Sequence, residues 1–593
     1  MPTSLFAPDF QAVLDATTTA EKSFPSPADW RDEWIYFLMV DRFNNPTAKP
    51  LDPFDDPDCF RYQGGKFSGI QQQLSYIKGL GAGAIWLSPV LKNSEFDQGS
   101  YHGYGIQDFL RVNPFFADVE ANADEELRAL VDAAHDAGLY VIFDIVLNHT
   151  ADVFGYAPSG NGGAPYSDNR MDVQWRDANG KAVAAFTSPA SVPHPTPDQL
   201  IWPAELQQNE YFRRQGDPAP AGDDTIGDFA PFKQLSTWEN DVQRFLIRSY
   251  QYVIARYDVD GFRIDTLRYL KGDLARIFGN SMREFALSIG KKNFFTFGEV
   301  LDGNEENDIA RFIGKNTTDQ GDMVGVDAAL DYPLFNNIVP LIKGSNAPQA
   351  MANMYQQRKL IEQSVLSSHG DATRYFVTFV DNHDSHARIR FIPPDGVPIF
   401  DDQVTAGLAC LLALPGIPCI YYGTEQGLHG AGKDPAVREA LWGGPGFDQT
   451  NPFYQQIKSI AAVRASQAAL RYGRFYFRPI SGDQRTFGIS SFSPGVLAFS
   501  RVLNDQEVLT IANFSTTSAQ TVSVIVDATL STPGDSFALL YSNQLAPTAP
   551  SRVSQLASGA VTINEVDGSQ GSGPVNILVV TLQPMETQIL RKH

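Results

Sequence analysis

Cysteine is scarce in this chain of 593 residues. It occurs only as Cys59, Cys410 and Cys419, an odd number, and no two of these have the close spacing of a zinc site or of a redox-active pair. These features exclude a disulfide-stapled scaffold and a cysteine-ligated zinc site. Cys410 and Cys419 lie near an apolar run, which predicts that they are buried free thiols.

Positive charge is also in short supply. The 46 Lys and Arg residues are outnumbered by 68 Asp and Glu residues, and the formal net charge is −22. Such a charge repels nucleic acid and anionic lipid, so we expect neither as a partner. A neutral polyol such as a sugar is compatible with it.

Long apolar runs are missing as well. No run is long enough to cross a membrane. The first residues, from Met1 to Leu5, lack the basic stretch and apolar stretch of a secretory signal. We therefore expect a cytoplasmic protein with no membrane partner, or a secreted protein that has lost its leader. The sequence leaves the oligomeric state open.

The overall composition is that of a globular protein. Hydrophobic residues make up 43% of the chain and charged residues 19%, which argues against extensive disorder. A chain of 593 residues exceeds what one hydrophobic core usually organises. We therefore expect two or three domains.

Short apolar runs alternate with amphipathic helical stretches through most of the chain. The eight runs are Ile35–Val40, Ala84–Pro89, Leu139–Leu147, Gly261–Asp265, Phe294–Val300, Val324–Leu330, Tyr375–Asn382 and Ile417–Gly423. This alternation predicts an α/β fold, a parallel (β/α)8 barrel. A doubly wound open sheet is the structural alternative, but no Gly-x-Gly-x-x-Gly follows the first run.

Two segments interrupt or precede this alternation. Residues 1–30 predict an N-terminal helical segment, because residues 9–22 are polar and helix-compatible and are followed by Pro25 and Pro27. Residues 150–235 contain many Gly, Pro, Asn and Asp residues and show no sustained period. Such a long irregular stretch predicts an inserted lid subdomain after the third strand.

The character of the chain changes again near its end. Residues 472–593 contain alternating or β-branched runs that are separated by Gly, Pro, Ser and Asn residues. This pattern predicts a C-terminal antiparallel β-sandwich. The barrel is then expected to comprise residues 31–149 and 236–471.

Four of the predicted strands end in polar or ionisable residues. The segments are Asp144–His149 (DIVLNH), Gly261–Asp265 (GFRID), Phe297–Val300 (FGEV) and Phe379–Asp384 (FVDNHD). A single Asp after a strand is usually a turn residue or a helix cap. In a barrel, however, the carboxyl ends of all strands meet at one face, where active sites lie. Four such segments on one rim predict a catalytic site.

These four segments resemble, in order, the conserved regions of the α-amylase family of glycoside hydrolases. Tyr101–Tyr104 (YHGY) is similar to the sugar-stacking loop of that family. Gly64–Ile70 and Ala84–Val90 are similar to its opening βαβ unit, and Pro415–Glu425 to its eighth strand. The resemblance extends over about residues 30–590, including the lid and the C-terminal sandwich.

The resemblance implies a role for each of three carboxylates. Asp265 corresponds to the nucleophile that forms a covalent glycosyl-enzyme, and Glu299 to the general acid that later acts as the base. Asp384 corresponds to the carboxylate that binds sugar hydroxyls more tightly in the transition state. Arg263 lies two residues before Asp265 on one strand and so points to the same side. It can therefore keep Asp265 ionised and oriented.

The resemblance also implies a set of substrate-binding residues. His149 and His383 correspond to histidines that hydrogen-bond the sugar at the point of cleavage, and Tyr104 to a ring that stacks under it. His102 belongs to the same loop as Tyr104. Many relatives have Lys-His shortly after the nucleophile, whereas this chain has Arg268 followed by a tyrosine. Arg268 is then a candidate for contacting sugar in an acceptor subsite.

A structural Ca²⁺ between the barrel and the lid is a further implication. Asn148 corresponds to one of its ligands, and Asp228 is the candidate ligand from the lid. Oxygen atoms from Asn and Asp suit calcium. Tyr269 stands where many relatives have a histidine ligand, so this site would need the backbone carbonyl of Tyr269 instead.

We therefore predict a retaining enzyme that acts on α-1,4-linked glucans or maltooligosaccharides, as a hydrolase or a glucanotransferase. An α-1,6-acting member of the family is the second hypothesis, and a sucrose- or trehalose-handling member is the third. The residues that follow Asp265 and those around Asp228 look more like α-amylases and cyclodextrin-forming relatives. A non-catalytic carbohydrate-binding scaffold is disfavoured because all three carboxylates are present.

Overall fold

The computed structural model of the chain describes residues 2–19, 23–52, 60–160, 169–215, 227–229, 231–270, 273–301, 305–313, 315–316, 325–361, 365–367, 370–371, 376–390, 400–432, 434–545, 551–556 and 559–593. Cys59 lies outside these residues. Cys410 and Cys419 are buried free thiols, as predicted.

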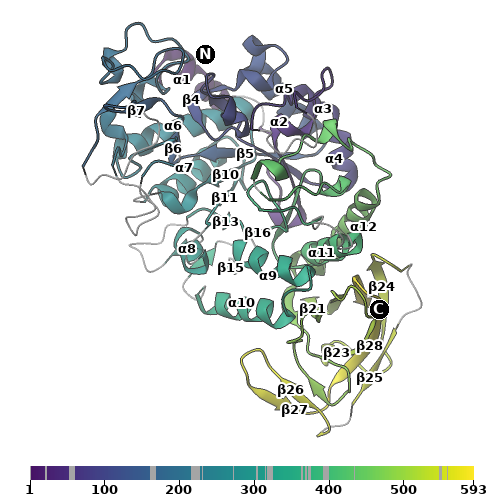
Figure 1. Cartoon of the computed structure of the whole chain (residues 1–593). Coiled ribbons are helices and arrows are strands. Elements are labelled where there is room, and N and C mark those ends of the chain that lie inside the picture. The colour runs from purple at the N-terminus through teal and green to yellow at the C-terminus, as the bar shows by residue number, and fades with distance from the viewer. Residues whose placement is uncertain are drawn as a thin grey trace.

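A closed parallel barrel forms the larger part of the molecule (Figure 1). Its strands are β1 (Ile35–Leu38), β2 (Ala84–Leu87), β5 (Tyr140–Val146), β10 (Gly261–Asp265), β11 (Phe295–Gly298), β13 (Ala328–Ala329), β16 (Val377–Thr378) and β17 (Ile417–Tyr421). They are hydrogen-bonded in the order β13-β11-β10-β5-β2-β1-β17-β16. A parallel bridge between Leu330 and Val377 joins the two ends of this sheet. Each predicted run contains one of the strands, and the predicted barrel is confirmed.

The barrel strands are apolar runs because both of their faces are covered. All residues of β1 and β17 are buried. One face of each strand packs inside the barrel and the other packs against the surrounding helices, so no polar alternation develops. This is why the eight strands can be found in the sequence as short continuous apolar runs.

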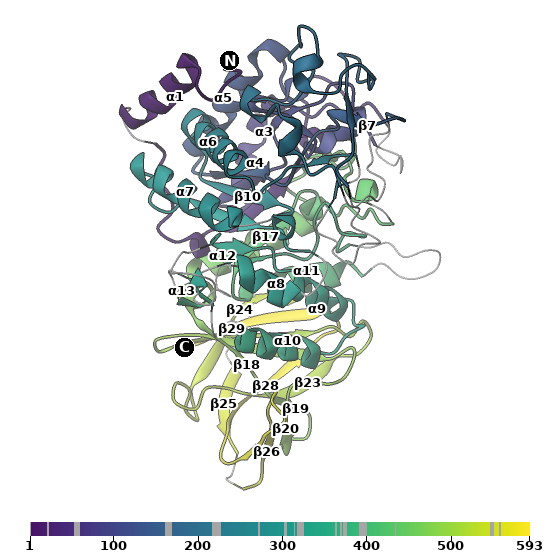
Figure 2. The same cartoon turned by 90° about the vertical axis from the view of Figure 1, so that its left-hand side faces the viewer.

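Helices surround the barrel (Figure 2). They are α2 (Val40–Phe43), α3 (Phe67–Gln72), α4 (Leu74–Leu80), α5 (Ala123–Asp136), α6 (Asn240–Tyr257), α7 (Leu274–Ser288), α8 (Glu305–Phe312), α9 (Tyr332–Ile342), α10 (Pro348–Ile361), α11 (Asp401–Ala413) and α12 (Pro452–Ser466). In α7 the buried positions Leu274, Phe278 and Met282 recur every four residues and face the core. None of the described helices combines the length and the apolar character that a membrane crossing needs.

The N-terminal helix α1 (Pro8–Thr19) lies against α6 on the outside of the barrel. The rings of Phe10 and Tyr252 stack with centroids 4.9 Å apart, and Arg248 donates a hydrogen bond to the carbonyl of Leu5. One helix, α1, is thus packed on the barrel within residues 1–30, for which a helical segment was predicted, and residues 20–22 lie outside the described part.

Between β5 and α6 the chain forms an irregular excursion over the barrel rim. It contains β6 (His149–Thr150), β7 (Phe154–Tyr156), β8 (Val173–Trp175), β9 (Lys233–Gln234) and the short helices η5 (Pro189–Ser191), η6 (Ala204–Leu206) and η7 (Asn209–Tyr211). β6 pairs with β9 and β7 with β8, both antiparallel. Phe154, Trp175 and Phe212 form an aromatic core with ring centroids 5.1–5.7 Å apart. This excursion is the lid expected after the third strand.

Two smaller sheets were not foreseen from the sequence. β3 (Leu91–Asn93) pairs with β4 (Ile106–Val112) between β2 and α5. β12 (Lys315–Asn316), β14 (Val365–Ser367) and β15 (Gly370–Asp371) form a three-stranded sheet between β11 and β16. Apart from β4, which has seven residues without a regular apolar alternation, these strands have only two or three residues, too few to show the pattern by which strands are recognised.

After the short helix α13 (Ala468–Tyr472) the chain is built of β-strands. A nine-stranded antiparallel sheet contains β18 (Arg474–Phe477), β19 (Ile480–Ser481), β21 (Val496–Leu503), β22 (Gln506–Asn513), β23 (Gln520–Ile525), β24 (Ser536–Ser542), β25 (Ser551–Gln555), β28 (Asn576–Leu582) and β29 (Glu586–Lys592). β20 (Thr486–Phe487), β26 (Thr562–Asn564) and β27 (Gln570–Ser572) form a separate small sheet. Side chains of β21 and β22 share one apolar cluster with those of β23 and β28, so the large sheet curls on itself around a core.

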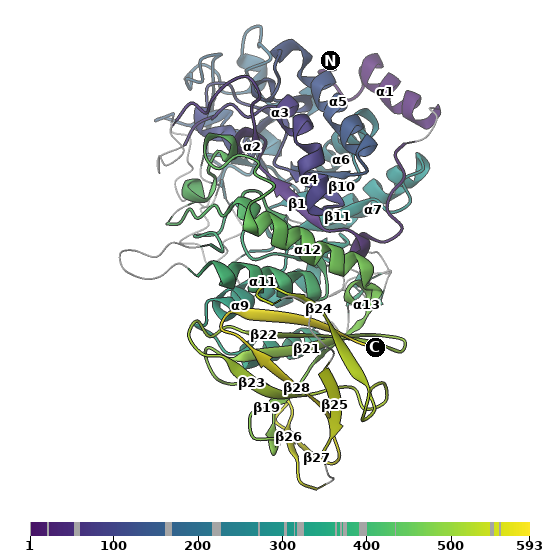
Figure 3. The ribbon, with the colours of Figure 1, turned by 90° about the vertical axis from the view of Figure 1, so that its right-hand side faces the viewer.

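Helix α11 lies between the barrel and the C-terminal sheet (Figure 3). Every residue from Gln403 to Ala413 is buried. On the sheet side, Thr587 donates a hydrogen bond of 3.1 Å to the carbonyl of Ala406, and Arg501 donates one of 2.9 Å to that of Ala413. The absence of a charged, solvent-facing side from Gln403 to Ala413 is what a helix that is covered on all sides requires.

We expect Leu412→Ala in α11 to lower the free energy of unfolding by about 2–5 kcal/mol, because it leaves a cavity in a site with no exposed surface. The matched control is Leu287→Ala, since Leu287 is 61% exposed on α7. Thermal unfolding monitored by circular dichroism measures both. Equal and small effects of the two changes would contradict the burial of α11 on all sides.

Candidate active site

A cavity of about 510 Å³ opens at the carboxyl ends of the barrel strands. The residues that line it are His102, Tyr104, His149, Phe229, Phe232, Asp265, Thr266, Tyr269, Glu299, Leu301, Asp384, His386 and Arg438. Six of the predicted site residues are among them: the three carboxylates, Tyr104, His102 and His149. The position agrees with the face on which barrels of this type carry their active sites.

Arg263 forms the floor of this site. β10 lies between β5 and β11, and Arg263 is directly opposite Asp144 in the strand register. Its Nη1 lies 2.9 Å from Asp144 Oδ1 and 2.9 Å from Asp265 Oδ1, and its Nη2 lies 3.0 Å from Glu299 Oε2. Arg263 is completely buried. One planar cation therefore fixes three carboxylates, which a flexible lysine ammonium would do less well.

Glu299 is held by two further donors. The backbone N–H of Thr266 donates to its Oε2 at 3.2 Å, and the hydroxyl of Tyr332 donates to its Oε1 at 3.2 Å. Thr266 has a φ of 48°, in the left-handed region that a β-branched residue rarely adopts. Strained backbone of this kind persists only where the surroundings enforce it, and it is common at functional sites. Here it lies directly after Asp265 and turns an N–H toward Glu299.

Asp384 reaches the cavity from the loop after β16. Its backbone N–H donates to Asn382 Oδ1 at 2.9 Å, which fixes the turn. Arg438 Nη2 lies 2.8 Å from Asp384 Oδ1, and His383 Nε2 lies 3.1 Å from Asp384 Oδ2. The carboxylate is thus held at the edge of the cavity, with part of its surface still exposed.

Tyr104 links the site residues of two loops. Its hydroxyl donates to Asp144 Oδ2 at 2.9 Å and lies 2.6 Å from His383 Nε2. Its ring stacks on that of His383 with centroids 5.5 Å apart. His383 therefore lies beneath the cavity and is not among the residues that line it, although it contacts both Tyr104 and Asp384.

The sequence matches the family described as alpha amylase, catalytic domain, over residues 37–471, which is most of the chain. The chain belongs to the alpha-amylase family. The matched residues include the barrel, the lid and every residue of the cavity described above.

Among the curated relatives of this alpha-amylase family member is the alpha-amylase of Streptomyces lividans, 28% identical over 76% of this chain and 50% of its own length. The cyclomaltodextrin glucanotransferase of Geobacillus stearothermophilus is 27% identical over 77% of this chain and 58% of its own length. This chain therefore spans only about half of such relatives. A solved alpha-amylase from Geobacillus thermoleovorans, complexed with acarbose, has the same fold, with a TM-score of 0.65 and 22% identity over 96% of this chain and 99% of its own.

The three histidines of the site are held neutral by burial. Burial lowers the pKa of His149 to about 4 and lowers those of His102 and His383 well below the ordinary value. The ring of His149 lies parallel to those of Phe232 and Phe229, at centroid distances of 5.2 and 5.8 Å. A neutral imidazole can both donate and accept a hydrogen bond, which suits a sugar hydroxyl.

Burial acts on the carboxylates in the opposite direction. It raises the pKa of Asp144 to about 7, although Arg263 and Tyr104 oppose the change. Burial also raises the pKa of Asp265, with Arg263 opposing and the charges of Glu299 and Asp144 adding to the rise. Asp144 and Asp265, which contact the same guanidinium, therefore each retain a proton more readily than an exposed aspartic acid would.

Arg268 is placed differently from the other predicted site residues. Its side chain is mostly buried outside the lining of the cavity, with Nε 3.4 Å from Asp308 Oδ2 of α8. Its backbone N–H donates to the carbonyl of Glu299 at 3.4 Å. In this conformation Arg268 contacts the helix that follows β11, and its role as an acceptor-subsite residue stays a prediction.

Several residues of the site were not recognised in the sequence. Phe229 and Phe232 come from the lid, Arg438 from the loop after β17, and Tyr332 from the start of α9. Phe229 stands next to Asp228, the candidate calcium ligand of the lid, so only its place in the sequence pointed to the site. Arg438 and Tyr332 lie in segments with no recognisable motif and meet Asp384 and Glu299 only in the fold.

The surroundings of Asn148 and Asp228 bear on the predicted calcium. Asn148 is fully buried, and its Oδ1 accepts a hydrogen bond from Gln234 Nε2 at 3.2 Å. Asp228 accepts from Tyr156 Oη at 2.7 Å and from the N–H of Gln234 at 3.0 Å, and it is paired with Lys233 at 3.5 Å. Within the described residues no group of three or more His, Cys, Asp or Glu side chains could hold a metal ion. The oxygens of Asn148 and Asp228 are thus engaged by protein donors and by Lys233, and the calcium site, whose ligands can also be backbone carbonyls, stays a prediction.

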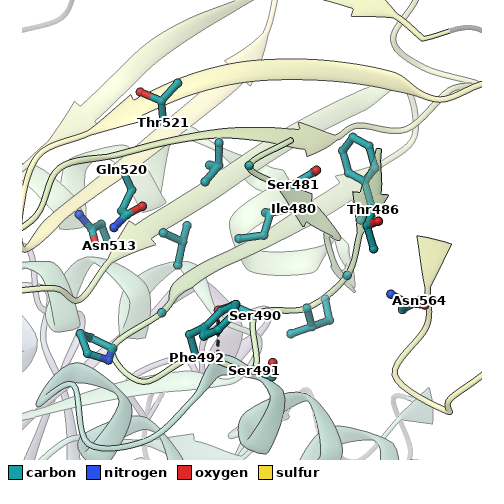
Figure 4. A pocket seen from close by; sticks show the side chains of 18 residues that line it. Ile480, Ser481, Thr486, Ser490, Ser491, Phe492, Asn513, Gln520, Thr521 and Asn564 are labelled. Carbon is teal, nitrogen blue, oxygen red and sulfur yellow. Dashed lines mark hydrogen bonds between the residues drawn. The ribbon is translucent and has the colours of Figure 1, made fainter. Parts of the chain in front are cut away.

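A second hollow, of about 470 Å³, lies in the C-terminal part between β19, β23 and the loop of residues 488–495 (Figure 4). Its polar lining consists of neutral groups, such as Ser481, Thr486, Gln520 and Asn564. None of its lining residues is ionisable. It therefore lacks the groups needed for acid–base chemistry, which the barrel cavity has.

The low pKa of His149 predicts how the stability of the fold depends on pH. The folded chain keeps His149 neutral down to about pH 4, whereas in the unfolded chain it takes up a proton near pH 6.5. The stability contributed by the neutral histidine is therefore present above pH 6.5 and is lost as the pH falls toward 4, by up to about 3 kcal/mol. We expect the stability gap between the wild type and His149→Gln to narrow over this window.

Thermal unfolding of both proteins at a series of pH values measures that gap. His386→Gln is the control, because His386 is another histidine of the cavity lining. A gap between the wild type and His149→Gln that stays constant from about pH 7 to pH 4.5 would contradict the burial of a neutral His149.

Proposed function

We propose that this chain is a retaining enzyme that acts on α-1,4-linked glucans or maltooligosaccharides through a covalent glycosyl-enzyme. The observation that supports the proposal most directly is the contact of one buried guanidinium, that of Arg263, with both Asp265 and Glu299. Both carboxyl groups open into a cavity of about 510 Å³. Glycoside hydrolysis needs two such carboxyl groups.

In the first step Glu299, in its protonated form, gives its proton to the glycosidic oxygen while an Asp265 carboxylate oxygen attacks the anomeric carbon. The bond between the anomeric carbon and the glycosidic oxygen breaks, and the leaving sugar departs with its new hydroxyl. Glu299 is left as a carboxylate. Arg263 contacts Asp265 and Glu299 throughout, so it can balance the charge that moves from one to the other.

In the second step the Glu299 carboxylate takes a proton from an incoming hydroxyl group, whose oxygen attacks the anomeric carbon. The ester bond to Asp265 breaks, and Asp265 becomes a carboxylate again. Water as the incoming molecule gives hydrolysis, and a sugar hydroxyl gives transfer. Two inversions at the same carbon yield net retention of configuration.

The spacing of the two carboxyl groups favours this route. Asp265 and Glu299 bind neighbouring nitrogens of one guanidinium, at 2.9 and 3.0 Å. An inverting enzyme needs carboxyl groups about 6.5–9.5 Å apart to admit a water molecule between base and sugar, whereas a retaining enzyme needs about 5–5.5 Å. The shared guanidinium supports the shorter distance.

Asp384 and the histidines bind the sugar and do not transfer protons to it. Asp384 is held by Arg438 and His383, which leaves its exposed edge to accept hydrogen bonds from sugar hydroxyls. Contacts of this kind accelerate the reaction to the extent that they strengthen in the transition state. His102 and His149, kept neutral by burial, can hydrogen-bond hydroxyls in either direction.

Transfer to a sugar is a second candidate outcome. Phe229 lines the cavity and is 41% exposed, and its ring meets that of Tyr269 edge-on at 5.6 Å. An exposed aromatic surface beside Glu299 offers a sugar acceptor a place to pack, which water does not need. The relatives include both an alpha-amylase and a cyclomaltodextrin glucanotransferase. Action on α-1,6 bonds, sucrose or trehalose remains the alternative among substrates.

A product time course on maltoheptaose, soluble starch, pullulan and sucrose tests this proposal. We expect turnover of maltoheptaose and starch, because the cavity and its carboxylates match an α-glucan chemistry. Products longer than maltoheptaose establish transfer, and only shorter products establish hydrolysis. Retention is read from the anomer that appears first by NMR. No turnover of any of the α-glucans would refute the proposal.

We expect Asp265→Asn and Glu299→Gln each to lower kcat/KM by roughly 10³-fold or more, with the fold intact because the amides are nearly isosteric. Asp265→Asn loses the nucleophile and should be inactive on every substrate. Glu299→Gln loses only the proton donor, so a glucosyl fluoride, which needs little acid help, should still form the covalent intermediate.

Mass spectrometry of the Glu299→Gln protein with the fluoride measures that intermediate as a mass increase on Asp265. The control is Asp132→Asn, an amide replacement at an exposed position of α5, which should leave kcat/KM unchanged. Turnover close to wild type by either active-site variant would show that the two roles are assigned wrongly.

A further inference from the structure

A buried lysine lies inside the lid, on the strand by which the chain returns to the barrel. The side chain of Lys233 in β9 has no exposed surface. Its Nζ lies 3.0 Å from Asp152 Oδ1 and 3.5 Å from Asp228 Oδ2, and it donates a hydrogen bond of 2.7 Å to the carbonyl of Pro231. The rings of Phe154 and Tyr156 lie 5.4 and 5.3 Å from the same nitrogen. The ammonium is thus surrounded by oxygens and by aromatic faces, both of which favour a cation.

Among the described residues, Lys233 belongs to a group of ion pairs with charges of both signs. Arg176 Nη2 lies 2.6 Å from Asp152 Oδ2, so two cations, Lys233 and Arg176, accompany two anions, Asp152 and Asp228. A divalent ion beside Asp228 would stand close to the ammonium of Lys233, which is completely buried, and would be repelled by it. Without Lys233, in contrast, the hydrogen-bond donors that the described residues offer to Asp228 are the neutral groups Tyr156 and the N–H of Gln234.

The same lysine closes a turn whose tip lines the substrate cavity. In this turn Phe229 and Phe232 exchange backbone hydrogen bonds of 3.1 and 3.0 Å. Asp228 and Lys233 lie at its two ends and are paired with each other. Phe229 and Phe232 both contact His149 and line the cavity. The ion pair therefore determines where the aromatic wall of the cavity stands.

Backbone pairing fixes the position of this turn relative to the barrel. Lys233 is opposite Thr150, and Gln234 is opposite His149, in the antiparallel pair of β9 and β6. The side chain of Gln234 also donates to Asn148 Oδ1 at 3.2 Å. The two residues for which calcium was predicted, Asn148 and Asp228, are thus joined through Gln234 and Lys233.

We propose that the ammonium of Lys233 is the internal cation that holds the two ends of the lid together, through Asp152 and through Asp228, the lid residue predicted to bind calcium, and that it positions the Phe229–Phe232 wall of the substrate cavity. Lys233 is a positioning residue, since it contacts the wall and not the substrate. The two ends of the lid are then held together by a cation that is part of the chain, which dilution or chelation cannot remove.

The first test uses the wild-type protein alone. We expect its melting temperature to be unchanged by excess EDTA and by excess calcium chloride, because a ligand stabilises a fold only if the folded state binds it. Metal analysis of the purified protein should find no stoichiometric calcium. Bound calcium whose removal by EDTA lowers the melting temperature would overturn the proposal.

The second test compares two buried lysines. We expect Lys233→Met to lower the melting temperature by about 5 °C or more, because it leaves Asp228 and Asp152 without their shared cation. Lys291→Met is the matched control, since Lys291 is equally buried and lies 2.9 and 2.7 Å from Asp258 and Asp260 at the opposite end of the barrel. Both changes should lower stability, but only Lys233→Met should raise KM, by roughly 3–10-fold with a smaller change in kcat. Equal KM values for the two variants would overturn the positioning role.

A double variant keeps the proposal testable if Lys233→Met does not fold. In Lys233→Met with Asp228→Asn the uncompensated charge on Asp228 is gone, so the double variant should be more stable than Lys233→Met alone. Additive losses would show that the pair is not coupled and would overturn the proposal. The KM comparison rests on the proposed function, whereas the melting and metal measurements do not. An inactive wild type would therefore refute the function and leave the stability tests valid.

Discussion

The active site depends on one buried charge. Arg263 is completely enclosed, and the three carboxylates around it, those of Asp144, Asp265 and Glu299, come from three adjacent strands of the barrel. Removing the guanidinium would leave mutually repelling carboxylates with little solvent to screen them. The parallel register of β5, β10 and β11 is what brings these residues side by side. Fold and site are therefore coupled through a single side chain.

The barrel was predictable because its strands are covered on both faces and appear in the sequence as separate apolar runs. In the described part of the chain, β13 and β16 are the shortest barrel strands, of two residues each, and parts of the predicted runs around them (Val324 and Tyr375) lie outside the described residues. The sheet of β12, β14 and β15 was missed because its short strands carry no apolar alternation. The curling of the C-terminal sheet was also out of reach, because it brings together β21 and β23, which are not neighbours in the sheet. Contacts between distant segments leave no local pattern.

The residues of the site divide in the same way, into those that a local sequence pattern reveals and those that only the fold brings together. Asp265, Glu299 and Asp384 stand at strand ends, where the position of a carboxylate in the chain reveals its position in space. Arg438 comes from a loop without a motif, and only the fold shows that it holds Asp384. The burial of Lys233 is even harder to predict from the sequence, because a lysine in a polar loop is normally exposed. Its burial depends on Asp152, Phe154 and Tyr156, which lie about eighty residues earlier in the sequence.

The burial of α11 on all sides has a consequence for how the chain can be divided. The helix belongs to the barrel by sequence, yet one of its faces is covered only by the C-terminal strands, through contacts such as those of Thr587 and Arg501. A protein cut after α13 would expose this face as an apolar patch of the kind that promotes self-association. The C-terminal sheet therefore acts as part of the folding unit of the barrel, and the two should unfold together. In evolutionary terms, a barrel of this design cannot exchange its C-terminal domain freely, because any replacement has to cover the same helix.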